Sequence, residues 1–188
     1  TLRELPKSIS QTDMFTWDSY ELGKRGTLAY NVEYPLWSDH SLKLRHIHLP
    51  ARARNSGLVR DAVRYDSKTQ TFSIPENARF YKTFFKQVRR ADGTLVARPV
   101  ETRVIVVRQA PRDPIYGTYI WNDDGSTATL LDAPYRDGTP WKDLVKDVIV
   151  DEQRGETRQY AVPARHRCQE CHMGSDDEGS FVLGFTPL

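Results

Sequence analysis

Both cysteines of the 188-residue chain lie in one short motif near its C-terminal end, Cys168-Gln-Glu-Cys171-His172. Cys-x-x-Cys-His is the attachment motif of a c-type haem. The two thiols add across the two vinyl groups of the haem, because their spacing matches the distance between those groups. The next residue, the histidine, then lies under the iron as its proximal ligand. We therefore expect one covalently bound haem, held by Cys168 and Cys171, with His172 as the proximal ligand.

Three other interpretations of the cysteine pair remain open. A disulfide is natural in an oxidising compartment. A thioredoxin-like redox pair requires a βαβ unit with the first thiol at a helix start, whereas a β hairpin is expected before Cys168. A zinc site needs two further ligands, for which His166 and His172 are available. We favour haem because it uses every residue of the motif.

Three arginines, Arg45, Arg103 and Arg165, are candidates for binding the haem propionates, since a guanidinium presents a planar pair of donors to a carboxylate. A more common role for such residues is the cross-strand ion pair. Lys43, Arg45, Glu101 and Arg103 have the composition for such pairs. We favour the ion-pair role over propionate binding.

The distal ligand of the iron is the least determined residue of the expected site. Met173 directly follows His172, so it cannot reach the opposite face of the same haem. The remaining histidines and methionine are Met14, His40, His46, His48 and His166. His46 and His48 share one face of an expected strand, although paired histidines on a strand are more often simply solvated. If the protein supplies a ligand, we choose His46 or His48.

The elements that must position these residues are mostly strands. Two β-prone runs flank the Asp-Gly turn at Asn122–Gly125, which predicts a hairpin. Alternation of side chains predicts further strands, and helix is indicated only at Trp141–Lys146. The expected strands cover 42–49, 100–107, 117–121, 126–131, 148–150 and 159–162. We expect a mostly β fold, a β-sandwich or open barrel with little helix and the haem-attachment segment near the C-terminus. Trp37 and Trp121 are expected in the core, and Asp39 in a turn.

Composition places the chain among globular proteins with one expected domain, residues 1–188, because 38% of its residues are hydrophobic and 28% are charged. No long apolar run predicts a membrane span. The 27 basic residues nearly balance the 25 acidic ones, so nothing calls for a nucleic-acid partner. Residues 174–180 are expected to form a polar loop. The N-terminus lacks the layout of a signal peptide, so an exported protein would be a mature or trimmed chain. The chain stops soon after the apolar patch 181–185, so we expect a piece of a longer protein.

Several spaced motifs together resemble a poorly characterised family of secreted bacterial c-type cytochromes. The resemblance runs from about Tyr30 to the end of the chain. Its blocks follow one another in a fixed order: Tyr34-Pro-Leu-Trp-Ser-Asp39 with Lys43-x-Arg45, then Glu101-Thr-Arg103, Tyr119-x-Trp-Asn-x-Asp-Gly125 and the cysteine motif.

The resemblance implies a haem c protein of the bacterial periplasm or cell surface. We expect electron transfer, with a redox partner protein or a further cytochrome module as the partner. A second hypothesis is a haem enzyme, or the haem subunit of one, with an open iron position. A third is a non-catalytic binding module in which the two cysteines form a disulfide.

Overall fold

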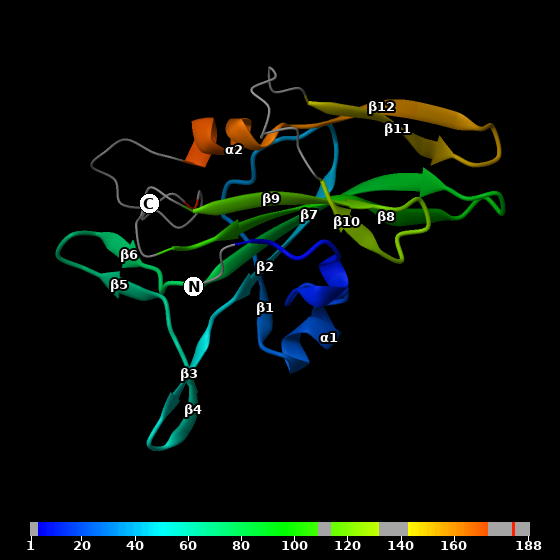
Figure 1. The fold of residues 1–188 in the computed structure, drawn as a ribbon. Coiled ribbons are helices and arrows are strands. Elements are labelled where there is room, and N and C mark those ends of the chain that lie inside the picture. The colour runs from blue at the N-terminus through cyan, green and yellow to red at the C-terminus, as the bar shows by residue number, and fades with distance from the viewer. Residues whose placement is uncertain (1–3, 109–113, 132–142, 173–181, 183–188) are drawn as a thin grey trace.

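A large antiparallel sheet organises the molecule (Figure 1). The computed structural model describes residues 4–108, 114–131, 143–172 and 182. Within them the main path of the sheet has the strand order β1-β2-β7-β8-β9-β10. Its strands are β1 (Thr27–Tyr30), β2 (Leu42–His48), β7 (Arg79–Arg89), β8 (Leu95–Val106), β9 (Ile115–Trp121) and β10 (Ala128–Leu130). The edges of this path, β1 and β10, do not pair with each other, so the described sheet is open. The predicted mostly β fold is confirmed.

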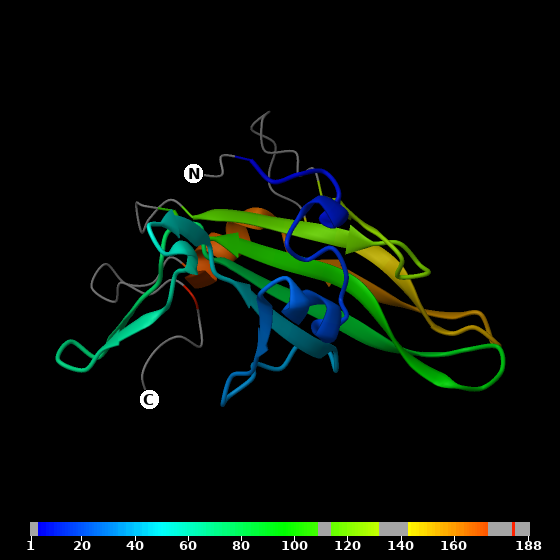
Figure 2. The same cartoon turned by 90° about the horizontal axis from the view of Figure 1, so that it is seen from below.

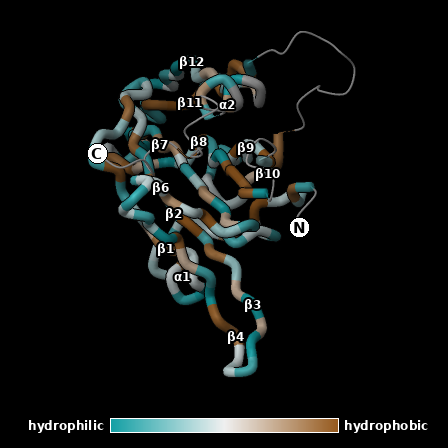
Figure 3. Tube along the Cα trace, turned by 90° about the vertical axis from the view of Figure 1, so that its left-hand side faces the viewer, coloured by the Kyte–Doolittle hydropathy of each residue, from teal (hydrophilic) through white to brown (hydrophobic). Residues whose placement is uncertain are grey.

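Three hairpins extend the architecture. β11 (Leu144–Asp151) pairs with β12 (Glu156–Val162), and Asp151 joins β7 through a parallel contact with Arg89. Two smaller hairpins form separate sheets: β3 (Ala51–Arg54) with β4 (Gly57–Arg60), and β5 (Arg64–Asp66) with β6 (Thr71–Ser73). The β3–β4 hairpin projects away from the main sheet (Figures 1 and 3), and β4 is exposed along its whole length.

Predicted turns and hairpins agree with the structure. Gly125 adopts a φ of 71°, a conformation that favours glycine, in the turn between β9 and β10. The side chain of Asn122 accepts a hydrogen bond from the Ser126 backbone N–H at 3.0 Å. The hairpin expected before Cys168 is β11–β12. Turns could be predicted because they depend on the types of a few consecutive residues.

The helices differ from the prediction. The described helices are η1 (Ile9–Gln11), α1 (Ser19–Lys24) and α2 (Arg165–His172). The helix predicted at Trp141–Lys146 is wrong over its described part, since Leu144 begins strand β11. Its side chains alternate in burial and pair with β12, so tertiary pairing overrides a weak helical signal. No helix in the described part of the chain is long and apolar enough to span a membrane.

The main sheet lies between two layers. Helix α1 lies against one face, hereafter the α1 face, and helix α2 with the β11–β12 hairpin lies over the other, the α2 face (Figure 1). Seen from below in Figure 2, the N-terminal segment and α1 lie in front of the sheet and α2 lies behind it. The sheet therefore separates the residues of the α1 face from those of the α2 face.

Strand register assigns each side chain to a face. Arg45, Lys82 and Arg103 are direct neighbours across β2, β7 and β8. Ile105 of β8 is opposite Tyr116 of β9, and Tyr116 contacts the His172 ring of α2. Because directly opposed side chains share a face and successive ones alternate, this row lies on the α2 face.

The main apolar cluster lies on the α1 face. It includes Met14, Leu22, Tyr81, Val104 and Trp121, and Val104 is only 1% exposed. Its buried members come from η1, α1, the segment between them and four neighbouring strands of the sheet, so packing joins these elements into one unit. Trp121 was expected in the core, and this expectation is confirmed. The Trp121 indole Nε1–H donates a hydrogen bond of 2.8 Å to Thr102 Oγ1, which satisfies its polar atom inside the core.

Candidate cofactor-binding site

Helix α2 brings the three residues of the Cys-x-x-Cys-His motif onto one side of a helix. Residues three and four positions apart are neighbours on a helical surface, so Cys171 and His172 both lie beside Cys168. Asp143 anchors the start of this helix, because its Oδ1 accepts the Ala164 backbone N–H at 2.9 Å and pairs with Arg167 Nε at 2.9 Å. The two cysteines do not form a disulfide with each other; Cys168 is half-buried and Cys171 is exposed.

The motif opens on a cavity of about 420 Å³ over the α2 face. This volume lies within the range of cofactor and small-molecule sites. Helix α2 forms one wall, the segment after β1 forms another, and the sheet forms the floor. The lining includes Tyr30, Tyr34, Leu36, Trp37, Arg45, Phe80, Lys82, Arg103, Ile105, Tyr116, Cys168, Cys171, His172 and Val182.

Three adjacent cations form the floor of the cavity. Arg45, Lys82 and Arg103 are opposed directly across three strands, an arrangement that is unfavourable for like charges. Arg103 is neutralised by Glu101 through two contacts, 2.6 Å from Nη2 to Oε1 and 3.1 Å from Nε to Oε2. Glu101 is fully buried and also accepts the Tyr160 hydroxyl at 2.6 Å. One carboxylate therefore serves one arginine and one tyrosine.

Arg45 and Lys82 have no such carboxylate. Arg45 is only 7% exposed. Within the described residues, neither its guanidinium nor the Lys82 ammonium takes part in a hydrogen bond or ion pair. Lys82 Nζ lies 5.1 Å from the centroid of the Phe84 ring. Burying a charge without a partner is costly, so the floor of the cavity is suited to an anionic group.

The lysines on the α2 face of the sheet have lowered pKa values. For Lys82 the largest cause is burial; repulsion from Arg45, Arg103 and Lys43 adds to it, the Glu101 carboxylate opposes it, and together these effects bring the pKa to about 8. The pKa of Lys43 is also lowered, first by burial and then by Arg45 and Arg103. Both pKa values are lowered because protonating either lysine adds a positive charge close to other positive charges.

Large apolar side chains stand at the mouth of the cavity. Tyr34, Leu36 and Trp37 are 76%, 67% and 70% exposed, although all three line it. The expectation that Trp37 belongs to the core is wrong, because it lies on a loop outside the sheet. A cofactor in the cavity would cover these side chains.

Two lysines of the sheet hold this loop. Lys43 Nζ donates to the Leu36 carbonyl and Lys86 Nζ to the Asp39 carbonyl. The predicted turn at Asp39 is confirmed, with Asp39 and His40 at φ of 43° and 54°. Such conformations are uncommon outside glycine. These contacts fix the loop beside the cavity.

Tyr116 lies between helix α2 and the sheet. Its ring centroid is 6.0 Å from that of His172, with an angle of 40° between the two ring planes. The Tyr116 hydroxyl is buried and has no hydrogen-bond partner among the described residues. An unsatisfied buried hydroxyl at the wall of a cavity is expected where a bound group completes the site.

The structure places His46 and His48 away from the cysteine motif, which corrects the prediction of a distal ligand. The His46 Nε2 is 2.8 Å from Ser19 Oγ of helix α1, and His48 Nδ1 is 2.9 Å from Thr27 Oγ1. Both side chains lie on the α1 face, with the sheet between them and α2. Strand alternation puts Arg45 on the cavity side and its neighbours on the other.

Two of the other residues considered as distal ligands, Met14 and His40, lie in different parts of the fold. Met14 is fully buried in the core of the α1 face, so it does not reach the cavity. The ring of His40 makes an edge contact with Trp37, with ring centroids 5.5 Å apart, on the loop beside the cavity. The side chains of Arg165 and His166, and the predicted polar loop 174–180, lie outside the described residues.

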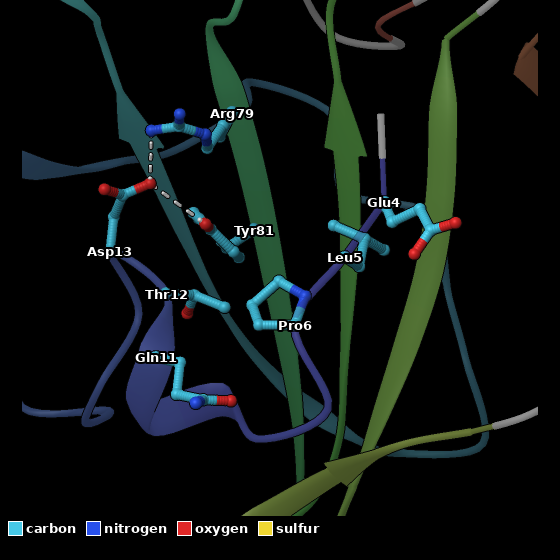
Figure 4. Close-up of a pocket in the computed structure, with 8 residues that line it drawn as sticks. All are labelled: Glu4, Leu5, Pro6, Gln11, Thr12, Asp13, Arg79 and Tyr81. Carbon is cyan, nitrogen blue, oxygen red and sulfur yellow. Dashed lines mark hydrogen bonds and ion pairs between the residues drawn. The ribbon is translucent and has the colours of Figure 1, made fainter. Parts of the chain in front are cut away.

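A second cavity, of about 470 Å³, lies on the α1 face (Figure 4). Its arginine is paired, since Asp13 Oδ2 accepts from Arg79 Nη1 at 2.7 Å and from the Tyr81 hydroxyl at 3.2 Å. The dashed lines of Figure 4 mark these contacts. Among the described residues, only the cavity on the α2 face combines the cysteine motif with two cations that have no ion pair, the buried Arg45 and the half-buried Lys82.

We expect the buried histidines to make the fold sensitive to acid. Burial lowers the pKa of His46 below its ordinary value of 6.5. The unfolded chain then binds the proton more readily than the folded one, so this stability is complete above pH 6.5 and is lost as pH falls below it. Urea unfolding between about pH 7 and pH 5 measures the loss. It should be smaller in His46→Gln than in wild type, and an equal loss in both would contradict the prediction.

Two alternatives for the cysteine pair can be compared with this geometry. No group of three or more His, Cys, Asp and Glu side chains able to hold a metal ion occurs in the described ranges. The element before α2 is the antiparallel hairpin β11–β12, as expected, and Cys168 lies inside the helix rather than at its first residue. A thioredoxin-like pair requires a βαβ unit with the first thiol at the start of the helix, so this arrangement does not fit it.

Lys82 and Tyr116 are site residues that the sequence argument missed. Lys82 was detectable as a lone cation within the apolar run Phe80–Phe85 of an expected sheet protein. Tyr116 carried no comparable signal, because its role depends on helix α2 packing over β9.

Comparisons with protein families, with curated proteins and with solved structures find no match to this chain.

Proposed function

We propose that this chain binds one haem c through Cys168 and Cys171, with His172 as proximal iron ligand, and transfers electrons in the bacterial periplasm or at the cell surface. The observation that carries the proposal is the cavity, in which two thiols and an imidazole on one helix face meet the buried Arg45 and the half-buried Lys82 and Arg103. Haem is an apolar macrocycle with two carboxylates and two vinyl groups, and each of these features has a counterpart among the lining residues.

The residues that line the cavity have the chemistry needed to hold a haem. Thiols supply the attachment and a neutral imidazole nitrogen supplies the iron ligand. Arg45 and Arg103, with Lys82 in addition, would take the propionates, since arginine binds carboxylates through two parallel hydrogen bonds. Glu101 holds the Arg103 guanidinium in place from the side away from solvent. Arg165 is proposed from the sequence alone.

Haem, when bound, supplies reversible one-electron oxidation and reduction of its iron. The described residues of the chain would determine how easily this occurs. Tyr34 and Trp37 would exclude water from the mouth of the cavity, and the cations on the floor would favour the more negatively charged, reduced state. The partner we propose is a redox protein or a further cytochrome module.

The test is production of the chain in a bacterial periplasm that contains the haem-ligation machinery. We expect a red protein, heavier than the polypeptide by the mass of one haem, whose colour survives extraction with acidified acetone. Low-spin absorption spectra in both oxidation states would support electron transfer. The same chain made in a cytoplasm without the machinery serves as control and should be colourless. An unmodified mass from the periplasm would refute the proposal, and a high-spin ferric spectrum that shifts with cyanide would favour a haem enzyme.

A further inference from the structure

We propose that Lys82 is a redox-linked proton site, which releases its proton when the haem iron is oxidised and takes one up when the iron is reduced. The inference rests on the proposed function and adds a regulatory property to it. It follows from the position of Lys82 in the middle of the row of cations that forms the cavity floor.

The surroundings of Lys82 make its charge costly. On β2 it faces Arg45 directly and Lys43 nearby, and on β8 it faces Arg103 and the Glu101 carboxylate. Its own strand contributes the Phe84 ring. The other titratable or charged groups lining the cavity are Tyr30, Tyr34, Tyr81, Tyr116, Arg167, Cys168, Glu170, Cys171 and His172. Three cations and one carboxylate, already shared by Arg103 and Tyr160, are its nearest charges.

Lys82 is the member of the row that can give up its proton. Arginine stays charged at all ordinary pH values, so Arg45 and Arg103 keep the floor positive. A lysine amine can become neutral, and burial together with its cationic neighbours brings the pKa of Lys82 to about 8. Lys43 lies on the same face, but its ammonium is held by the Leu36 carbonyl.

The iron and Lys82 would share one cavity of about 420 Å³, so their charges would interact. Oxidation removes one electron from the iron, which passes to a one-electron acceptor, and adds one positive charge to the cavity. The Lys82 ammonium then loses a proton to solvent and becomes a neutral amine. Reduction reverses both steps. The propionates would raise the proton affinity of Lys82 in both states, so the coupling would occur in the neutral to alkaline range.

The experiment measures the midpoint potential of the haem protein between about pH 6 and pH 10.5 by optical titration with one-electron mediators. The wild-type potential should be flat at low pH and then fall as pH rises, with a slope approaching 59 mV per pH unit where one proton accompanies one electron. The slope should vanish in Lys82→Met and in Lys82→Arg. The arginine variant keeps the positive charge, so its potential should lie above that of the methionine variant throughout. Lys24→Met is the control and should keep the slope, because Lys24 lies on the exposed surface of helix α1 and does not line the cavity.

Two results would overturn the inference while leaving the haem in place: a flat wild-type profile, or a slope that persists in both Lys82 variants. The covalent haem spectrum of each variant shows separately whether the proposed function holds. A second measurement covers variants that load haem poorly. In the haem-free protein, NMR of carbon-13-labelled lysine should show the Lys82 side chain titrating well below the other lysines, and an ordinary titration would also overturn the inference.

Discussion

Replacing both Cys168 and Cys171 by alanine removes covalent haem attachment. Each thioether needs its own thiol, so each single variant should keep at most one bond and yield less haem protein. The double variant should lose its colour completely on extraction with acidified acetone. His172 and the cations of the floor remain in it, so any haem that it binds is held without a covalent bond. The measurement is the mass and the absorption spectrum before and after extraction.

Glu170→Gln is the matched control for this experiment, because it changes a residue inside the motif without touching a thiol. It should keep its covalent haem. Colour that survives extraction in the double alanine variant would show that the attachment lies elsewhere, and the assignment of haem c to this motif would fail.

Replacing Glu101 by leucine should lower the free energy of unfolding by about 3–5 kcal/mol, the range found when one member of a buried ion pair is removed. Glu101 is fully buried, and its loss leaves Arg103 without a carboxylate next to Lys82 and the Tyr160 hydroxyl without its acceptor. Glu101→Gln keeps an acceptor for Tyr160 but loses the charge, so it should be destabilised less. Urea unfolding of the haem-free chain measures both.

Glu156→Gln is the control for Glu101. Glu156 and Arg158 are also two residues apart on one strand and lie 3.6 Å from each other, but both are well exposed. Solvent screens such a pair, so this variant should unfold near wild type. If Glu101→Leu also unfolds at the wild-type urea concentration, the buried network does not hold the cavity floor together.

Local signals predicted the hairpins and missed the helices. The Asp-Gly turn before β10 and the alternation in β8 are properties of a few consecutive residues, so the sequence states them openly. Helix α1 also had a local signal in the sequence, which was overlooked: Asp18 is followed three residues later by Glu21. In the structure the Asp18 side chain accepts a hydrogen bond of 2.8 Å from the Tyr20 backbone N–H. An acidic cap followed three residues later by glutamate is typical of a helix start.

The sequence by itself determined the chemistry of the expected site. The two thiols and the imidazole are adjacent along the chain, so their spacing does not depend on how the rest folds. The same holds for the mostly β class, because the alternating strands and their turns are encoded over short distances.

Only the tertiary structure decided which residues share the cavity. Arg45 and His46 are neighbours on β2, and the sequence treats both as candidates for the same site. Register places Arg45 opposite Lys82 on the α2 face, whereas His46 is opposite Tyr81 on the α1 face. The physical reason is the pleat of a strand, in which successive side chains point to opposite faces. Which face meets helix α2 depends on packing between residues far apart in the chain, such as Tyr116 and His172.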